Sequence, residues 1–204
     1  MERYPDGQDK VLTTRSKGAS PPAPPAEDLT ESFEPIVGQS VTLRTLRPED
    51  HDIEHAFVGG LSPETRHNRL LGGAIRVTRE YIERLITVDF SRDMALAAAL
   101  MLEDREVLIG VARYVLDSDG RGCEFAVVIA DAWQGRGIGR RMMEKLIAVA
   151  RNRGLSRIYG DVLSTNRPML DFCRGLGFAL GRSPDDATIT RATLQLGGEE
   201  LLVR

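Results

Sequence analysis

Three closely spaced glycines, Gly135, Gly137 and Gly139, stand between an apolar segment and a strongly helical pattern in ADAWQGRGIGRRMMEKL. Glycine in the first turn of a helix costs about 1 kcal/mol relative to alanine, so the cluster needs a compensating use. Backbone N–H groups that carry no side chain approach anionic oxygens closely, and a helix N-terminus adds partial positive charge. Arginines lie beside the turn, at Arg136, Arg140 and Arg141. The spacing predicts a phosphate-binding turn.

Two familiar phosphate-binding patterns do not fit this turn. The nucleotide P-loop ends in Gly-Lys-Ser/Thr, whereas this chain has Gly139-Arg140-Arg141. The dinucleotide fingerprint G-x-G-x-x-G is met at its first two glycines, and Asp161 follows at a suitable distance, but Arg140 stands at the third glycine position. That fold also opens with its glycine turn, and here several expected elements come first.

A zinc signature and two cysteines also invite a chemical interpretation. HDIEH at 51–55 matches H-x-x-E-H, but the remaining histidine, His67, belongs to another expected helix and no third ligand is evident. We interpret the motif as a chance match on a polar helix face and expect no metal. Cys123 and Cys173 have no metal spacing and indicate no disulfide framework.

Several elements must precede the turn. Alternating Val41 and Leu43 predict a first strand. Helix starts are predicted at Pro48 and at Ser62–Pro63, the second helix ending at Gly72–Gly73. A helical stripe runs from Tyr81 to Val88 through Ile82, Leu85 and Ile86. Strands follow at Met94–Leu102, Glu106–Leu116 and Cys123–Ala130, with a hairpin turn at Ser118–Gly122.

After the turn, a helix is expected with Met142, Met143, Leu146, Ile147 and Ala150 inward and Gly154 as its end. A strand at Ser156–Leu163, a short helix within Asn166–Phe178 and a late strand within Ala187–Leu196 complete the pattern. Antiparallel strands followed by strand, helix and strand predict a mixed sheet with helices packed on it, which is an α/β or α+β fold.

The composition of the chain limits which binding partners and which cellular compartment can be expected. The chain has 204 residues, 42% hydrophobic and 28% charged, which fits one domain plus a tail. We expect residues 1–35, rich in Pro, Ser and acidic residues, to be a disordered tail and residues 36–204 to be the folded domain. A net charge of −3 indicates no nucleic-acid partner. The N-terminus has no apolar signal region, and the longest apolar run, Met94–Leu102, is too short for a membrane span. We therefore expect a cytoplasmic protein.

A third phosphate pattern, Q/R-x-x-G-x-G/A, is met by Gln134, Gly137 and Gly139. It resembles the pyrophosphate loop of the GNAT superfamily, the Gcn5-related N-acyltransferases that use acetyl-coenzyme A (acetyl-CoA). The resemblance extends over Glu124–Phe178, where strand, glycine turn, long helix, strand and N-x-x-M-x-x-x-x-x-x-L-G-F follow in the family's order. It implies a mixed, mostly antiparallel sheet whose central strands splay apart to admit the pantetheine arm.

The resemblance assigns cofactor contacts residue by residue. Backbone groups of the central strand would pair with pantetheine and polarise the thioester carbonyl. The glycine turn would hold the pyrophosphate, with Arg136 and Arg140 as charge partners, and Asn166 matches a cofactor-contacting asparagine. The full expected set is Val127, Val128, Ile129, Gln134, Gly135, Arg136, Gly137, Ile138, Gly139, Arg140 and Asn166.

Amine acetylation also needs a base, because a lysine amine with a pKa near 10.4 is almost entirely protonated at neutral pH. Glu124, the only acid in CEFAVVIA, is the candidate, acting directly or through water; a solvated strand-end glutamate or salt-bridge partner is the alternative. The family's leaving-group tyrosine is replaced here by Cys173, so Cys173 or water protonates the thiolate, or it leaves unaided. Both cysteines are assigned to packing, and direct attack by the amine is expected.

The sequence gives the least information about the amine that accepts the acetyl group. LRTLRPEDHD, LSPETRHNRLL and VDFSRDMALAA resemble the GNAT domains of bacterial Pat-type enzymes, which acetylate a lysine of acyl-CoA synthetases. That resemblance implies a protein lysine acceptor, although we expect no regulatory module within residues 1–35, which are too few for a CoA-ligase-like or cyclic-nucleotide-binding domain. A small-amine acetyltransferase is the alternative, with Arg66 and Arg69 lining the acceptor groove or simply solvated, and a non-catalytic acyl-CoA sensor is another.

Overall fold

The structure is a computed structural model that describes residues 29–74, 76–184 and 186–197. One eight-stranded sheet forms its centre, in the order β1-β2-β3-β4-β5-β6-β8-β7. Its strands are β1 (Glu31–Ile36), β2 (Gln39–Thr45), β3 (Met94–Leu102), β4 (Arg105–Leu116), β5 (Gly122–Ile129), β6 (Arg157–Leu163), β7 (Ala179–Arg182) and β8 (Ile189–Gln195). Neighbouring strands are antiparallel except β5 and β6, which are parallel. The expected mixed, mostly antiparallel sheet flanked by helices is confirmed.

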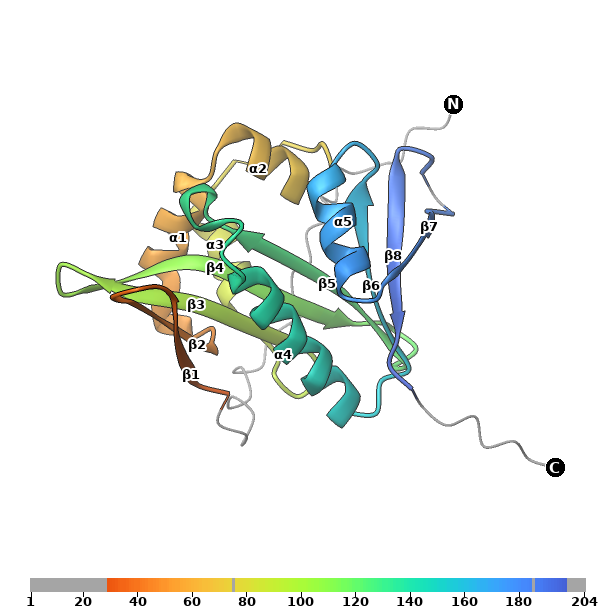
Figure 1. Ribbon diagram of the computed structural model, residues 1–204, viewed down its shortest axis with the longest axis horizontal. Coiled ribbons are helices and arrows are strands. Elements are labelled where there is room, and N and C mark those ends of the chain that lie inside the picture. The colour runs from red at the N-terminus through yellow and green to blue at the C-terminus, as the bar shows by residue number, and fades with distance from the viewer. Residues whose placement is uncertain (1–28, 75, 185, 198–204) are drawn as a thin grey trace.

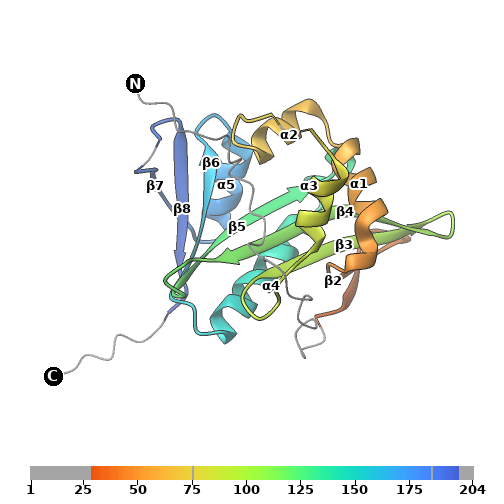
Figure 2. The same cartoon turned by 180° about the vertical axis from the view of Figure 1, so that it is seen from behind.

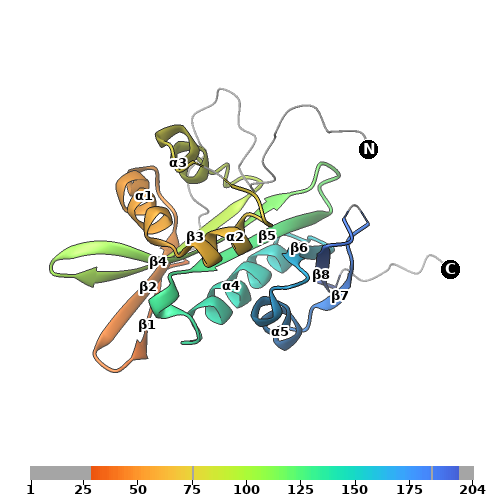
Figure 3. The ribbon, with the colours of Figure 1, turned by 90° about the horizontal axis from the view of Figure 1, so that it is seen from above.

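Helices cover both faces of the sheet (Figure 1). On one face lie α1 (His51–Gly60) and α3 (Arg79–Ile86), and on the other lie α4 (Ile138–Asn152) and α5 (Arg167–Gly175). The short α2 (Pro63–Arg69) contacts β5, next to α1 and α3, as the view from behind shows (Figure 2). Viewed from above, the two helical layers lie on opposite sides of the sheet (Figure 3).

The sequence pattern explains the core. Met94–Ala99 of β3 are buried without alternation, because helices cover both faces of the central strands. The inward stripe of α4 is also as expected, since Met142, Met143, Leu146, Ile147 and Ala150 are all buried. Among the described residues, no helix has the length and apolar character needed to cross a membrane.

The expected domain boundary is corrected by β1. Glu31–Ile36 forms an edge strand paired with β2, so the fold begins before residue 36. The strand is stabilised from outside: Glu31 forms ion pairs with Arg141 and Lys145 of α4, and the Arg141 guanidinium stacks over Phe33 at 4.5 Å. The expected tail over residues 1–28 lies outside the described residues.

The parallel strands β5 and β6 pair only at their beginnings. Gly122, Cys123 and Glu124 pair with Arg157, Ile158 and Tyr159, and no pairing continues along the remainder of the two strands. Gly160 of β6 makes room for the ring of Phe125, whose atoms would lie 2.7 Å from a Cβ at that position. The expected splay of the central strands is therefore confirmed, and Glu124 is the last paired residue before it.

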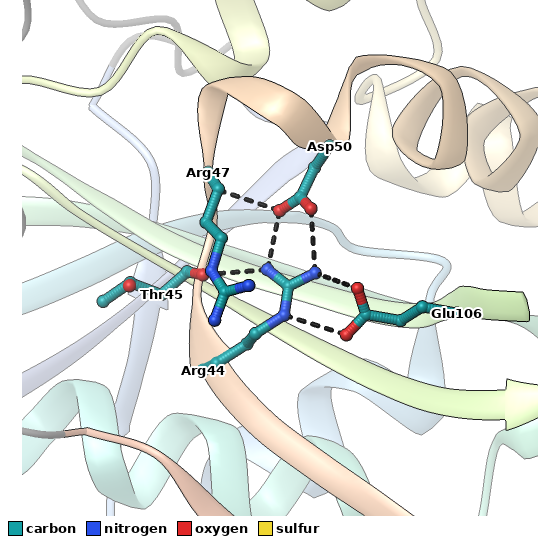
Figure 4. A network of polar contacts seen from close by, with 5 residues as sticks. All are labelled: Arg44, Thr45, Arg47, Asp50 and Glu106. Carbon is teal, nitrogen blue, oxygen red and sulfur yellow. Dashed lines mark hydrogen bonds and ion pairs between the residues drawn. The ribbon is translucent and has the colours of Figure 1, made fainter.

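A buried ion-pair network fixes the start of α1 (Figure 4). Arg44, 2% exposed, donates to both carboxylate oxygens of Asp50 at 2.7 and 2.8 Å and to both of Glu106 at 2.8 and 3.0 Å. Asp50 also accepts the Arg47 backbone N–H at 2.8 Å. Burial lowers the pKa of Arg44, but hydrogen bonds to Asp50 and Glu106 outweigh it and raise the pKa above its ordinary value. We name Arg44, Asp50 and Glu106 the α1 clamp.

Candidate active site

The free edge of β5 lies beside the gap that opens where β5 and β6 splay apart beyond Glu124. Val127, Val128 and Ile129 pair with β4, but β6 has diverged at this level and offers no ladder partner within the described residues. Backbone groups on that edge are therefore available to an extended ligand, as strand addition requires. This is the geometry expected for the pantetheine arm, while the contact itself stays a prediction.

The glycine turn ends at the start of α4, which has no side-chain cap. Gly137 is the N-cap residue, in the left-handed region at φ 80°, whereas α2, α3 and α5 are capped by Ser62, Thr78 and Asn166. The first helical hydrogen bond runs from Arg141 N–H to Gly137 O, so the N–H groups of residues 138–140 precede the helical ladder. Gly135 and Gly137 are exposed, whereas the Ile138 side chain is buried and leaves only its backbone for a ligand. The turn therefore leaves backbone N–H groups open to an anionic ligand, and phosphate binding there stays a prediction.

The predicted charge partners have other contacts in this structure. Arg136 donates to Ala132 O at 3.1 Å and lies over Trp133. Arg140 donates to Gly175 O of α5 at 3.0 Å and pairs loosely with Glu144 at 3.4 Å. Both are exposed side chains at the turn, so these contacts hold them near the position assigned to the pyrophosphate.

A hydrogen-bond network joins the glycine turn to α2. Asp131 accepts from Ser62 N–H at 3.0 Å, Ser62 Oγ at 2.7 Å and Thr65 Oγ1 at 2.7 Å. Gln134 Nε2 donates to Ile129 O at 3.1 Å and reaches Thr65 Oγ1 at 3.3 Å. Hydrogen bonds from Ser62 and Thr65 lower the pKa of Asp131 to about 2. Asp131, Ser62, Thr65 and Gln134 form what we call the turn–α2 bridge.

The two glycines of the pattern should respond differently to alanine. At Gly137 a Cβ meets open space but the φ of 80° penalises it by about 1–2 kcal/mol, and a side chain there blocks close approach of phosphate. At Gly139 a Cβ makes only ordinary contacts with Ile129 and Phe172, at 3.5 and 3.7 Å. We expect Gly137→Ala to raise the Kd for coenzyme A about tenfold or more and Gly139→Ala to change it little, as measured by calorimetry. Equal effects of the two changes would contradict the assignment.

The two residues singled out in α5 from the sequence, Asn166 and Cys173, lie in different surroundings: one at the start of the helix and one in the core. Asn166 is the N-cap of α5, and its Oδ1 accepts the Met169 N–H at 3.2 Å; its cofactor contact stays a prediction. Cys173 is fully buried, and burial raises the pKa of its thiol to about 12. Burial raises the pKa of Cys123 to about 12 as well. Both thiols therefore pack in the core, where neither is activated.

Glu124 lies at the vertex of the gap and is half-buried. It pairs with Val115 of β4 on one side and with Tyr159 of β6 on the other. Side chains alternate along a strand, so Glu124 shares a face with Ala126 and Val128, opposite the fully buried Cys123. Arg69 and Tyr159 both lie within electrostatic range of its carboxylate.

On that same face a cavity opens between β4, β5 and the helices α1, α2 and α3. It offers about 540 Å³ of empty space, its open mouth included. Its polar lining is Glu54, Arg66, Arg69, Tyr81 and Arg113, and the remainder is apolar, including Ala126 and Val128. We name it the α1–α3 cavity. It places Arg66 and Arg69, which the sequence left undecided, beside the strand assigned to the thioester.

Sequence reasoning missed Glu54, which is 2% exposed. Its Oε2 is buried without a hydrogen-bond partner. Within the apparent zinc motif, His55 is exposed while Glu54 shares the buried side of α1 with Phe57. The described residues contain no group of three or more potential metal ligands. The signal that could have found Glu54 is its spacing of three and seven residues from Phe57 and Leu61, which puts an acid on an apolar stripe.

Glu54 should make stability depend on pH. Burial raises its pKa to about 7, against the opposing pull of Arg113 and Arg69, from 4.5 in the unfolded chain. Between these values the folded state holds a proton that the unfolded state has released, so the unfolding free energy falls as pH rises. We expect Glu54→Gln to gain roughly 3 kcal/mol relative to wild type between pH 4.5 and pH 7, in denaturant titrations. The exposed Glu49→Gln serves as control. If the unfolding free energy of Glu54→Gln changed with pH in parallel with that of wild type, the expectation would be refuted.

Comparison with known proteins gives a consistent result. Residues 69–178 match the acetyltransferase (GNAT) family. The chain is 40% identical over 152 residues to acetyltransferase PA5475 of Pseudomonas aeruginosa, a match that covers 74% of this chain and 81% of that protein.

Solved structures share the fold. The GNAT domain of S. lividans PAT superposes with a TM-score of 0.71 at 24% identity, covering 81% of this chain and 96% of that domain. RimL, a ribosomal L7/L12 α-N-protein acetyltransferase in complex with coenzyme A, superposes with a TM-score of 0.63 at 11% identity, covering 81% and 98%.

Proposed function

The chain belongs to the GNAT acetyltransferase family, and on this premise we propose that it transfers the acetyl group of acetyl-CoA to a protein lysine, with Glu124 as general base. The observation that carries the proposal is the gap between β5 and β6, which has the uncapped start of α4 beyond one end and Glu124 at its vertex. A pyrophosphate at the turn and a pantetheine arm along β5 would bring the thioester to the face that carries Glu124.

The proposed reaction is a direct displacement. Glu124 accepts one proton from the acceptor ammonium, and the amine nitrogen then attacks the thioester carbonyl. The tetrahedral adduct loses a second N–H proton to water as the carbon–sulfur bond breaks, which gives the amide and the coenzyme A thiolate. Val127–Ile129 lie three to five residues beyond Glu124, or roughly 10–17 Å along the strand, so the proton passes through water. Water also protonates the thiolate, because Cys173 is buried with a raised thiol pKa.

The uncovered half of the sheet supports a macromolecular acceptor. Within the described residues, no helix covers β6 and β8 on the face that carries Glu124 (Figure 3). Tyr159 and Arg191 are half-buried there, and Arg191 pairs with the buried carboxylate of Asp161 at 2.8 Å. A protein segment can reach this open, polar face and insert a lysine side chain towards the thioester.

A small amine is the second candidate acceptor. The observation that favours it is the α1–α3 cavity, whose wall combines polar side chains of α1, α2 and α3 with Ala126 and Val128 of β5. A lysine side chain and a small amine present the same primary amine to this wall, so the lining residues do not distinguish the two acceptors.

The experiment that tests the function is release of free thiol from acetyl-CoA over a panel of acyl-CoA synthetases, lysine peptides and small amines, with mass spectrometry of each product. A lysine-acetylated protein supports the proposal. Turnover on small amines alone replaces the acceptor class, and tight coenzyme A binding without any transfer indicates a sensor. An acetyl thioester trapped on Cys123 or Cys173 would overturn direct attack.

A further inference from the structure

The α1–α3 cavity holds more positive than negative charge. Three guanidinium groups, those of Arg66, Arg69 and Arg113, line it together with one carboxylate, that of Glu54. Arg113 is 3% exposed, and burial lowers its pKa to about 10. Burial also lowers the pKa of Arg69. The Arg113 guanidinium is thus held away from water, whereas Arg66 and Arg69 are half-buried in the wall of the cavity.

Glu54 does not fully balance the two guanidinium groups of α2, those of Arg66 and Arg69. Burial pushes its own carboxyl towards the protonated form at neutral pH, as its pKa of about 7 shows. Arg66 and Arg69 have no side-chain hydrogen bond or ion pair in the part of the chain that the structure describes. Glu124 acts on Arg69 only as a nearby charge. The cavity therefore lacks an anion close to α2.

We infer that the acceptor carries a carboxylate beside its reacting amine and that Arg69, with Arg66, binds this carboxylate in the α1–α3 cavity. The inference rests on the proposed acetyltransferase function and specifies its acceptor. Guanidinium groups bind carboxylates through paired, charge-assisted hydrogen bonds, so Arg69 can both neutralise and orient the acceptor.

The position of Arg69 also orients the amine. Arg69 lines the cavity from α2 and lies within electrostatic range of Glu124, while Val128 lines the cavity from the strand assigned to the thioester. A carboxylate held by Arg69 leaves the neighbouring amine beside β5, between Glu124 and the segment Val127–Ile129 assigned to the thioester. The cations also disfavour the protonated amine, which raises the fraction of acceptor that can attack.

Two sources supply this chemistry, a free amino acid and a lysine whose neighbour in a peptide is acidic. The test therefore uses matched acceptors: free amino acids against their carboxamides, and lysine peptides flanked by Asp against the same peptides flanked by Asn. We expect kcat/KM to favour the carboxylate member by about 10–100-fold in one of the two arms. The arm that shows the preference identifies the source.

Variants of the full-length chain show whether Arg69 causes the preference. Arg69→Gln should bring the ratio near one, chiefly through KM, and Arg69→Lys should restore part of it. Arg151→Gln, which removes the same charge from an exposed position on α4, should leave the ratio unchanged. Calorimetry on the coenzyme A complex should show the carboxylate member binding more tightly, independently of turnover.

The outcomes separate the inference from the function beneath it. The proposed carboxylate site is overturned if, in both arms, the ratio of kcat/KM between the carboxylate acceptor and its neutral counterpart is near one or favours the neutral member. If such neutral acceptors are still acetylated in a Glu124-dependent manner, the acetyltransferase proposal stands without it. If no acceptor in the panel is acetylated while acetyl-CoA binds, the proposed function fails and the inference fails with it.

Discussion

Replacing Glu124 with glutamine should lower kcat/KM for amine acetylation by about 10²–10⁴-fold at neutral pH. Glutamine has nearly the same shape but cannot accept a proton, so the loss reports proton removal rather than packing. Because Glu124 lies at the vertex of the gap and away from the glycine turn, coenzyme A should bind the variant about as well as wild type. Thiol release and calorimetry measure the two effects.

The pH dependence supplies the control for this prediction. An amine acetylated without its base should gain rate as pH rises, since more of the acceptor is already neutral, and the variant should therefore approach wild type at high pH. Glu83→Gln, an exposed change on α3, controls for the loss of a carboxylate. A greater loss of activity in Glu54→Gln than in Glu124→Gln would place the base on α1 instead.

Breaking the α1 clamp should have the largest effect on stability. In Asp50→Ala the buried Arg44 loses two hydrogen bonds and an ion pair, and only Glu106, which is partly exposed, remains to pair with it. Leaving one partner of a buried ion pair uncompensated typically costs 3–5 kcal/mol. We expect a loss of about 3 kcal/mol or more in denaturant unfolding.

Two further variants distinguish the buried pair from a general effect on α1. Glu49→Ala, at the exposed neighbouring position, should change the unfolding free energy little. Arg44→Met combined with Asp50→Leu removes both buried charges and should be more stable than Asp50→Ala alone, because an apolar pair needs no compensation. A double variant as unstable as the single one would show that the clamp acts through packing.

Sequence patterns identified the elements around the site well. Met94–Leu102 has the same bounds in the structure as in the sequence analysis, because an unbroken apolar run bounded by polar residues suits a central strand. The glycine turn was placed correctly between β5 and α4, since only glycine easily adopts the positive φ of residues 135 and 137. Both the strand and the glycine turn are therefore determined by residues that are adjacent in the sequence.

The missed features depend on distant contacts. β1 contains Pro35 and polar residues that suit a tail, and its pairing with β2 and ion pairs to α4 are tertiary. β7, four residues long with Gly181, is ordered by β8. The cavity was missed for the same reason, because α1, α2, α3 and β4 each contribute only one or two of its polar side chains.

The turn–α2 bridge has a thermodynamic consequence. Asp131 and Gln134 stand at the turn assigned to the pyrophosphate, and their hydrogen bonds to Ser62 and Thr65 hold the helix that carries Arg66 and Arg69. We therefore expect a ligand that shifts the turn to alter the wall of the cavity, so that the two proposed substrates bind cooperatively. Linkage then requires that the factor by which coenzyme A changes acceptor affinity equal the factor by which the acceptor changes coenzyme A affinity.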